Sequence, residues 1–125
     1  MQELIERFMS KKKFAVIGAT ANPHKFGNKI VKNLKNRGYD VYPVNPGLKE
    51  LEGLKCYPSL QEIPTKVDVV DFVVPPEVTE EVIKECRALG LNNIWLQPGA
   101  ESDAAIDYCR KHGLNVVHDV CVMQH

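Results

Sequence analysis

The fold is decided by residues 14–27, which read FAVIGATANPHKFG. Residues 14–17 are all apolar, and Gly18 ends the run. An uninterrupted apolar run of this length, closed by a glycine, predicts a strand that is buried on both faces. Residues 28–37 then carry apolar side chains at helical spacing and stop at Gly38, a residue typical of helix ends. The stretch therefore predicts a strand, a glycine loop and a helix in succession.

The same alternation continues along the chain. A helix is predicted at residues 2–12, ahead of the first strand. Further strands are predicted at 40–44, 67–74, 93–96 and 114–118, and further helices at 77–89 and 102–112. Pro43 within the second strand indicates a sheet edge or a strand end, because proline cannot donate to a neighbouring strand.

Two shorter segments complete the outline. Residues 48–57 show no regular pattern and are expected to be irregular. Residues 59–63 predict one helical turn, with Ser59 as the cap and Glu62 completing a capping box. Ser102 is likewise expected to cap the helix that follows it.

This alternation of strands and helices is typical of the α/β class. We expect a single Rossmann-like domain over residues 1–125, with an open, mostly parallel sheet of about five strands and helices on both faces. The length and the 44% hydrophobic content suit one domain. Right-handed crossovers place the carboxyl ends of the strands along one edge, where ligands bind in open sheets of this kind.

Charge and cysteine content limit the possible binding partners and the cellular compartment. The 16 basic and 16 acidic residues cancel, whereas nucleic-acid and membrane-surface binders usually carry an excess of positive charge. Neither partner is expected, and no apolar run is long enough to span a bilayer. Residues 1–13 lack the apolar stretch of a signal peptide, and the four cysteines form no CxxC pair. These features predict a cytoplasmic protein with reduced thiols.

The loop after the first strand is a candidate phosphate site. Gly18 permits a tight turn and a close approach of ligand to backbone. Thr20 and Asn22 offer hydrogen bonds to phosphate oxygens, while His24 and Lys25 add charge ahead of a helix start that favours anions. The loop has neither the GxGxxG nor the P-loop spacing, so a simple turn is the alternative interpretation.

The end of the second strand discriminates among nucleotide cofactors. NAD-binding folds usually place an acidic residue there, to accept hydrogen bonds from the ribose hydroxyls. This chain has Val44, Asn45 and Pro46 instead, and Lys49 follows shortly after. An amide with a nearby lysine suits a phosphorylated ribose, which favours coenzyme A or NADP over NAD.

Several strings in this order resemble one known family. They are GATANP at 18–23, YDVYPVNP at 39–46, YPSL at 57–60, IP at 63–64, VDVVD at 67–71, WLQPG at 95–99 and DVC at 119–121. The chain resembles the small stand-alone CoA-binding proteins, which are similar to the N-terminal CoA-binding domain of the succinyl-CoA synthetase α subunit. It departs from them at Val120, where the family often has a basic residue, so no phosphate contact is implied there.

The resemblance implies a set of contacts with coenzyme A. The phosphates would be held by Gly18, Ala19, Thr20, Asn22 and Lys25. The adenosine would lie along Val44, Asn45 and Pro46, with Lys49 reaching the ribose phosphate. An apolar wall near the adenine would be formed by Val74, Pro75 and Pro76. The pantetheine path would be lined by Leu96 and Gln97.

No catalytic motif is evident, because the chain lacks GxSxG and HExxH sequences. The synthetase reaction uses a phosphorylated histidine in a second domain, for which this chain has no room. We therefore expect a non-catalytic or regulatory module that binds coenzyme A or a short acyl-CoA. Two alternatives stay open: an NADP-dependent reductase, and a structural or regulatory subunit with a vestigial pocket. The sequence indicates no particular protein partner.

Cys121 is the remaining chemical candidate. It follows the last predicted strand at the ligand edge, where a thiol would be able to form a mixed disulfide with that of coenzyme A or to sense oxidation. The alternative is an inert, partly buried thiol. His118, Cys121 and His125 match no zinc signature, so no metal site is predicted.

Overall fold

The computed structural model describes residues 1–125, and its centre is a five-stranded sheet. The strands are β1 (Lys13–Ile17), β2 (Asp40–Val44), β5 (Val69–Phe72), β6 (Asn93–Leu96) and β7 (Asn115–Val117). They lie in the order β2-β1-β5-β6-β7, and every neighbouring pair is parallel. From β1 the chain first forms β2 on one side and then crosses back to form β5, β6 and β7 on the other side. The space between β1 and β5 is therefore a topological switch point.

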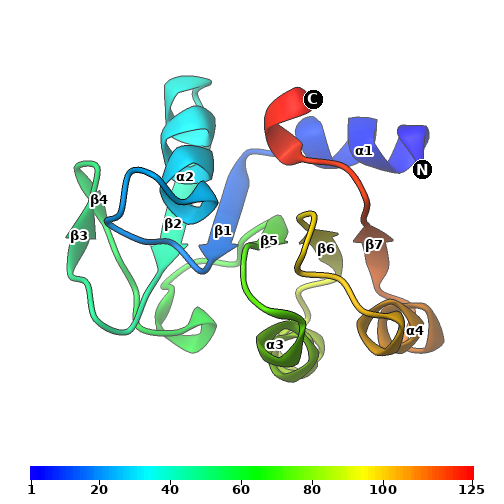
Figure 1. The fold of residues 1–125 in the computed structure, drawn as a ribbon. Helices are drawn as coiled ribbons and strands as arrows, with labels where there is room; N and C mark the ends of the chain where they lie inside the picture. The colour runs from blue at the N-terminus through cyan, green and yellow to red at the C-terminus, as the bar shows by residue number, and fades with distance from the viewer.

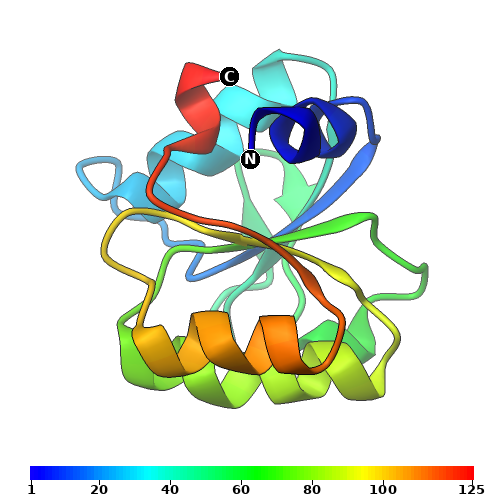
Figure 2. The same cartoon turned by 90° about the vertical axis from the view of Figure 1, so that its right-hand side faces the viewer.

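Helices cover both faces of this sheet (Figures 1 and 2). One face carries α1 (Gln2–Met9), α2 (Phe26–Asn36) and the short 3-10 helix η2 (Val122–Gln124), and the other carries α3 (Pro76–Ala88) and α4 (Asp103–Lys111). The predicted fold class, a Rossmann-like domain with helices on both faces, is confirmed. None of these helices is long and apolar enough to cross a membrane.

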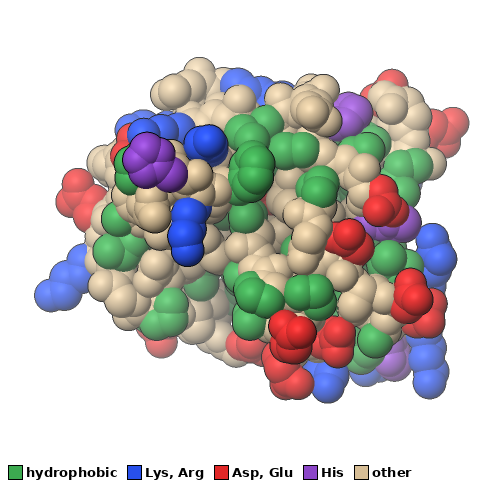
Figure 3. All heavy atoms as spheres, in the orientation of Figure 1, with side chains coloured by type: hydrophobic (Ala, Val, Ile, Leu, Met, Phe, Trp, Pro, Cys, Tyr) green, Lys and Arg blue, Asp and Glu red, His purple; other side chains and the backbone are tan.

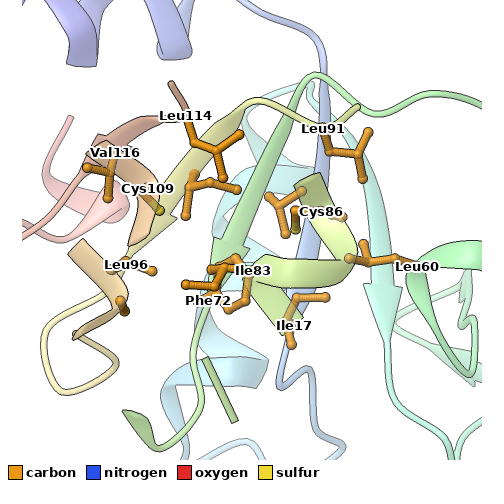
Figure 4. Close-up of a cluster of buried hydrophobic side chains, with 14 of the residues drawn as sticks. Ile17, Leu60, Phe72, Ile83, Cys86, Leu91, Leu96, Cys109, Leu114 and Val116 are labelled. Carbon is orange, nitrogen blue, oxygen red and sulfur yellow. The ribbon is translucent and has the colours of Figure 1, made fainter. Parts of the chain in front are cut away.

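Two hydrophobic clusters fill the layers between the sheet and the helices. Successive residues of a strand point to opposite faces, so Val16 packs on the α1 and α2 side while Ala15 packs on the α3 and α4 side. Trp95 is fully buried on the α1 and α2 side, and its indole N–H donates to the carbonyl of Val120 at 2.9 Å. Figure 4 shows the cluster on the α3 side. Burial on both faces explains why the strands are almost continuously apolar.

Some predicted boundaries were wrong. The first helix ends at Met9 rather than at residue 12, because the backbone N–H groups of Lys12 and Lys13 turn to the carboxylate of Asp68, at 3.2 and 2.9 Å. The strand predicted at 67–74 is shorter, since pairing with β1 covers only Val69 to Phe72. As Pro43 indicated, β2 lies at a sheet edge.

The segment expected to be irregular contains a small hairpin. Strands β3 (Glu50–Leu51) and β4 (Leu54–Lys55) pair antiparallel around Glu52 and Gly53, both with positive φ. Two such residues make the turn that suits a tight hairpin. The prediction failed because glutamate rarely adopts this conformation, so the turn carries no usual sequence signal.

The two predicted serine caps differ in outcome. Ser102 caps α4 by accepting a hydrogen bond from the N–H of Ala105 at 3.0 Å, as expected. The 3-10 helix η1 (Leu60–Glu62) has no side-chain cap, so the capping box predicted for Ser59 and Glu62 was wrong. A three-residue helix leaves few N–H groups to cap, and the Ser59 side chain instead faces a cleft described below.

Candidate functional site

Two glycines bring the backbone together at the switch point. Gly18 follows β1 with φ +94°, and a Cβ there would lie 2.2 Å from the carbonyl oxygen of Val73, which follows β5. Gly27 lies in the first turn of α2, where a Cβ would be 2.1 Å from the carbonyl oxygen of Gly18. Neither site can hold a side chain without displacing backbone. The sequence analysis found Gly18 but missed Gly27, although its place at the helix start was a usable signal.

The loop between these glycines is held by its own polar side chains. The hydroxyl of Thr20 accepts from the N–H of Asn22 at 3.2 Å, and the Asn22 carbonyl oxygen Oδ1 accepts from the N–H of His24 at 3.0 Å. Asn28, nearly fully buried in α2, donates to the backbone carbonyl of Thr20 at 2.9 Å. The loop is therefore ordered before any ligand arrives. Asn28 was not anticipated, since its role depends on contacts across the helix start.

A cleft of about 490 Å³ opens over this loop, and we call it the glycine-loop cleft. It is lined by Gly18, Thr20, His24, Lys25, Phe26, Gly27 and Val73. No side chain caps the N-terminus of α2, and its first turn carries no acidic residue. The positive end of the helix dipole and two basic side chains therefore favour an anion. Figure 3 shows histidine and basic side chains over the β1–α2 loop, while acidic ones gather over α3 and α4.

A second cleft, of about 290 Å³, shares Gly18 with the first, and we call it the apolar cleft. It lies between the ends of β1 and β2, η1 and one side of α3. Its lining is Ile17, Gly18, Ala19, Val44, Asn45, Pro46, Pro58, Ser59, Leu60, Val74, Val78, Val82 and Glu85. No lysine, arginine or histidine lines it, so it is suited to an uncharged group rather than to a phosphate.

The apolar cleft has few polar side chains, and most of them already form hydrogen bonds within the protein. The Asn45 amide donates to the carbonyl of Ala19 at 2.8 Å, and its Oδ1 accepts from the N–H of Gly47 at 2.7 Å. Asn45 thus ties the end of β2 to the glycine loop. Glu85 Oε1 accepts from the Gln61 side chain at 2.8 Å, which links α3 to η1.

The structure brings most of the predicted site residues together. Six line the apolar cleft, namely Gly18, Ala19, Val44, Asn45, Pro46 and Val74. Thr20 and Lys25 join Gly18 in the glycine-loop cleft. Asn22 accepts a hydrogen bond within the loop, as described above. Pro75 lines a separate shallow hollow, and Pro76 begins α3.

Three predicted residues lie elsewhere, namely Lys49, Leu96 and Gln97. Gln97 is buried, and its contacts are described below. Lys49 is exposed beyond β2 and lines neither cleft. Leu96 has no exposed surface and packs in the cluster of Figure 4, so its side chain does not reach a ligand. Its alternation along β6 explains this, because Leu96 points to the α3 and α4 face.

Residues from η1 and α3 were missed. Val78, Val82 and Glu85 follow one another along a single side of α3, at helical spacing. Val78 is 41% exposed although it is apolar. This could have been expected, because an apolar residue on the solvent side of a helix that follows a loop at the ligand edge indicates a binding surface. Ser59 was assigned to a cap, which concealed its place in the cleft.

A buried carboxyl connects the sheet to the C-terminal segment. Asp71 in β5 is fully buried, and this burial raises its pKa from 3.8 to about 7 despite a hydrogen bond from Gln97. The Gln97 amide donates to Asp71 Oδ1 at 2.6 Å, and Gln97 Oε1 accepts from the N–H of Val122 at 3.2 Å. Asp71 Oδ2 has no partner. Gln97 therefore serves as a link between β5 and η2.

The four cysteines are all free thiols. Burial raises the pKa of the Cys86 thiol far above its usual value and that of Cys109 to about 11, so both resist ionisation. Cys56 is also buried, whereas Cys121 is half-buried and lines a third cleft. No three histidine, cysteine or acidic side chains gather in a way that would hold a metal ion.

A parallel sheet of this strand order, with an anion-favouring glycine loop and an apolar cleft at its switch point, defines a Rossmann-like nucleotide-binding domain. A sequence model described as the CoA binding domain matches residues 12–125. The chain belongs to this CoA-binding domain family, which confirms the resemblance found in the sequence.

Similar proteins fall into two groups, namely ligases that match this chain over a small part of their length and proteins that it matches over most of their length. The α subunit of acetate–CoA ligase [ADP-forming] II from Pyrococcus furiosus is 31% identical over 95% of this chain. The chain spans 28% of that subunit and 17% of a related Archaeoglobus fulgidus ligase. A conserved hypothetical protein from P. furiosus is 46% identical, with a TM-score of 0.87, and the match covers 90% of this chain and 97% of the other. A hypothetical protein from Pyrococcus horikoshii is 36% identical, with a TM-score of 0.91 and coverage of 98% and 87%.

Proposed function

We propose that this protein binds coenzyme A, with the adenine in the apolar cleft and the diphosphate in the glycine-loop cleft. The observation that carries the proposal is the junction of the two clefts at Gly18. A nucleotide needs an apolar site for its base directly beside a site for its phosphates. Membership of the CoA-binding domain family favours coenzyme A over NADP as the ligand.

The charges support this orientation. His24 and Lys25 line the glycine-loop cleft, where the α2 N-terminus adds its partial positive charge. Glu85 is the one charged side chain of the apolar cleft and would repel a phosphate there. The reverse orientation would place phosphates against this carboxylate. Lys49, outside both clefts, would interact with the ribose phosphate at the rim through its long side chain.

We also propose a binding or regulatory role without catalysis. The ionisable groups of the two clefts are His24, Lys25 and Glu85; the first two would bind the diphosphate, and the Glu85 carboxylate accepts a hydrogen bond from Gln61. The free cysteines suit a reducing cytoplasm.

Calorimetric titration with coenzyme A, NADP and NAD tests the proposal. We expect micromolar binding of coenzyme A and a preference of at least about tenfold over both dinucleotides, equivalent to about 1.4 kcal/mol. Lys25→Ala should weaken binding several-fold, whereas Lys11→Ala, an exposed lysine outside the clefts, should leave it unchanged. Binding of NADP in preference to coenzyme A, or equal effects of the two variants, would contradict the proposal.

A further inference from the structure

Three polar side chains line the apolar cleft, and two of them keep a free hydrogen-bonding group. Asn45 both donates and accepts within the protein, as described above. Glu85 uses Oε1 to accept from Gln61, whereas its Oε2 forms no hydrogen bond within the protein. The hydroxyl of Ser59 is also free. The second oxygen of Glu85 is therefore the one charged acceptor that the cleft offers to a ligand.

The helix and a hydrogen bond hold the Glu85 carboxylate in place. Glu85 lies about one turn beyond Val82 and two turns beyond Val78, so the three side chains share one side of α3 and line the same cleft. The hydrogen bond from Gln61 Nε2, at 2.8 Å, limits the rotation of the carboxylate. Glu85 is half-buried in a largely apolar lining, where a hydrogen bond to a charged group is stronger than in water.

A carboxylate restricts which groups of a base can face it. An ionised carboxyl group accepts hydrogen bonds and donates none. The ring nitrogens of adenine in a nucleotide are acceptors, and its exocyclic amino group is the only N–H donor of the base. A base that lacks this amine would leave the Glu85 carboxylate partly desolvated and without a partner, which is costly.

These observations assign a role in base selection to Glu85, given the proposed function on which this step rests. We infer that Glu85 is a specificity-determining residue, which accepts a hydrogen bond from the exocyclic amino group of adenine through its free oxygen. Gln61 is a positioning residue, because it contacts the carboxylate and does not line the cleft. The protein thus distinguishes adenine from a purine that has no amino group at the same position.

A pair of nucleotides that differ only in this amine tests the inference. Nuclear magnetic resonance titrations, which measure affinities into the millimolar range, compare ADP with purine riboside diphosphate, in which a hydrogen replaces the amino group. The purine nucleotide should bind at least about tenfold more weakly. Inosine diphosphate is a less suitable probe, because its ring N–H can itself donate to a carboxylate. Equal affinities for ADP and the purine nucleotide would overturn the inference while leaving coenzyme A binding intact, whereas failure of coenzyme A to bind would refute the proposed function.

A substitution of the glutamate completes a double-mutant cycle with the two nucleotides. Glu85→Ala should weaken ADP binding about tenfold and reduce the difference between the nucleotides to less than about twofold. Glu81→Ala, which removes an exposed carboxylate from the same helix, should keep the full preference for ADP. If Glu85→Ala binds neither nucleotide, Glu85→Met, which retains the length of the side chain, repeats the comparison. A preference for ADP that survives in either Glu85 variant would contradict the inference.

Discussion

Replacing Asp71 by asparagine should change how the stability of the protein depends on pH. The Asp71 carboxyl is fully buried, and burial raises its pKa from 3.8 to about 7. A difference of this size between the unfolded and folded states corresponds to ~4 kcal/mol. Because the folded state holds the proton more tightly, the neutral carboxyl favours folding below about pH 4. This contribution to the free energy of unfolding is lost as the pH rises toward 7, and it no longer changes above that pH.

Asparagine resembles the neutral carboxyl and does not titrate. The free energy of unfolding of Asp71→Asn, measured relative to the wild type, should therefore rise between pH 4.5 and pH 8 by up to ~4 kcal/mol. Urea unfolding at a series of pH values measures this difference, and any constant packing effect of the substitution cancels. Asp107→Asn, at an exposed position on α4, controls for loss of a carboxyl. Parallel stability curves for the wild type and Asp71→Asn would refute the reasoning.

Three further predictions concern the loop, the caps and the thiols. Gly27→Ala should weaken coenzyme A binding more than tenfold in calorimetry, because its Cβ would meet backbone at 2.1 Å, whereas Gly47→Ala, whose nearest neighbour would be 3.4 Å away, should not. Ser102→Ala should cost about 1 kcal/mol of stability in urea unfolding, while Ser59→Ala, which removes no cap, should cost less than about 0.5 kcal/mol; equal losses would contradict the assignment. A thiol reagent should label only Cys121 in the native protein, because the other three cysteines are buried; rapid labelling of all four would contradict the burial.

The sheet and its ligand edge were predictable because both depend on local pattern. A strand buried on both faces requires a continuous apolar run, and the run ending at Gly18 had no other simple interpretation. The Ser102 cap was equally local. The Glu52–Gly53 turn was not predictable, since glutamate adopts a positive φ there only within the folded hairpin.

The site was predictable where it follows directly from a strand end and less so elsewhere. Asn45 and Val44 end β2, so their place at the ligand edge followed from topology. Glu85 and Ser59 come from elements whose approach to the edge depends on tertiary packing. Leu96 illustrates the opposite error, because the motif that contains it lies at the edge while its own side chain points into the core.

The most direct test of the account is a nuclear magnetic resonance titration of the isotopically labelled protein with coenzyme A. The account predicts that the backbone amide signals of Gly18, Phe26 and Gly27 shift with increasing ligand, along with those of the apolar cleft. The amide signals of Gly90 and Gly113, which lie between α3 and β6 and between α4 and β7, should stay in place. Absence of any shift, or shifts confined to residues outside the two clefts, would contradict the claim that this edge of the sheet binds coenzyme A.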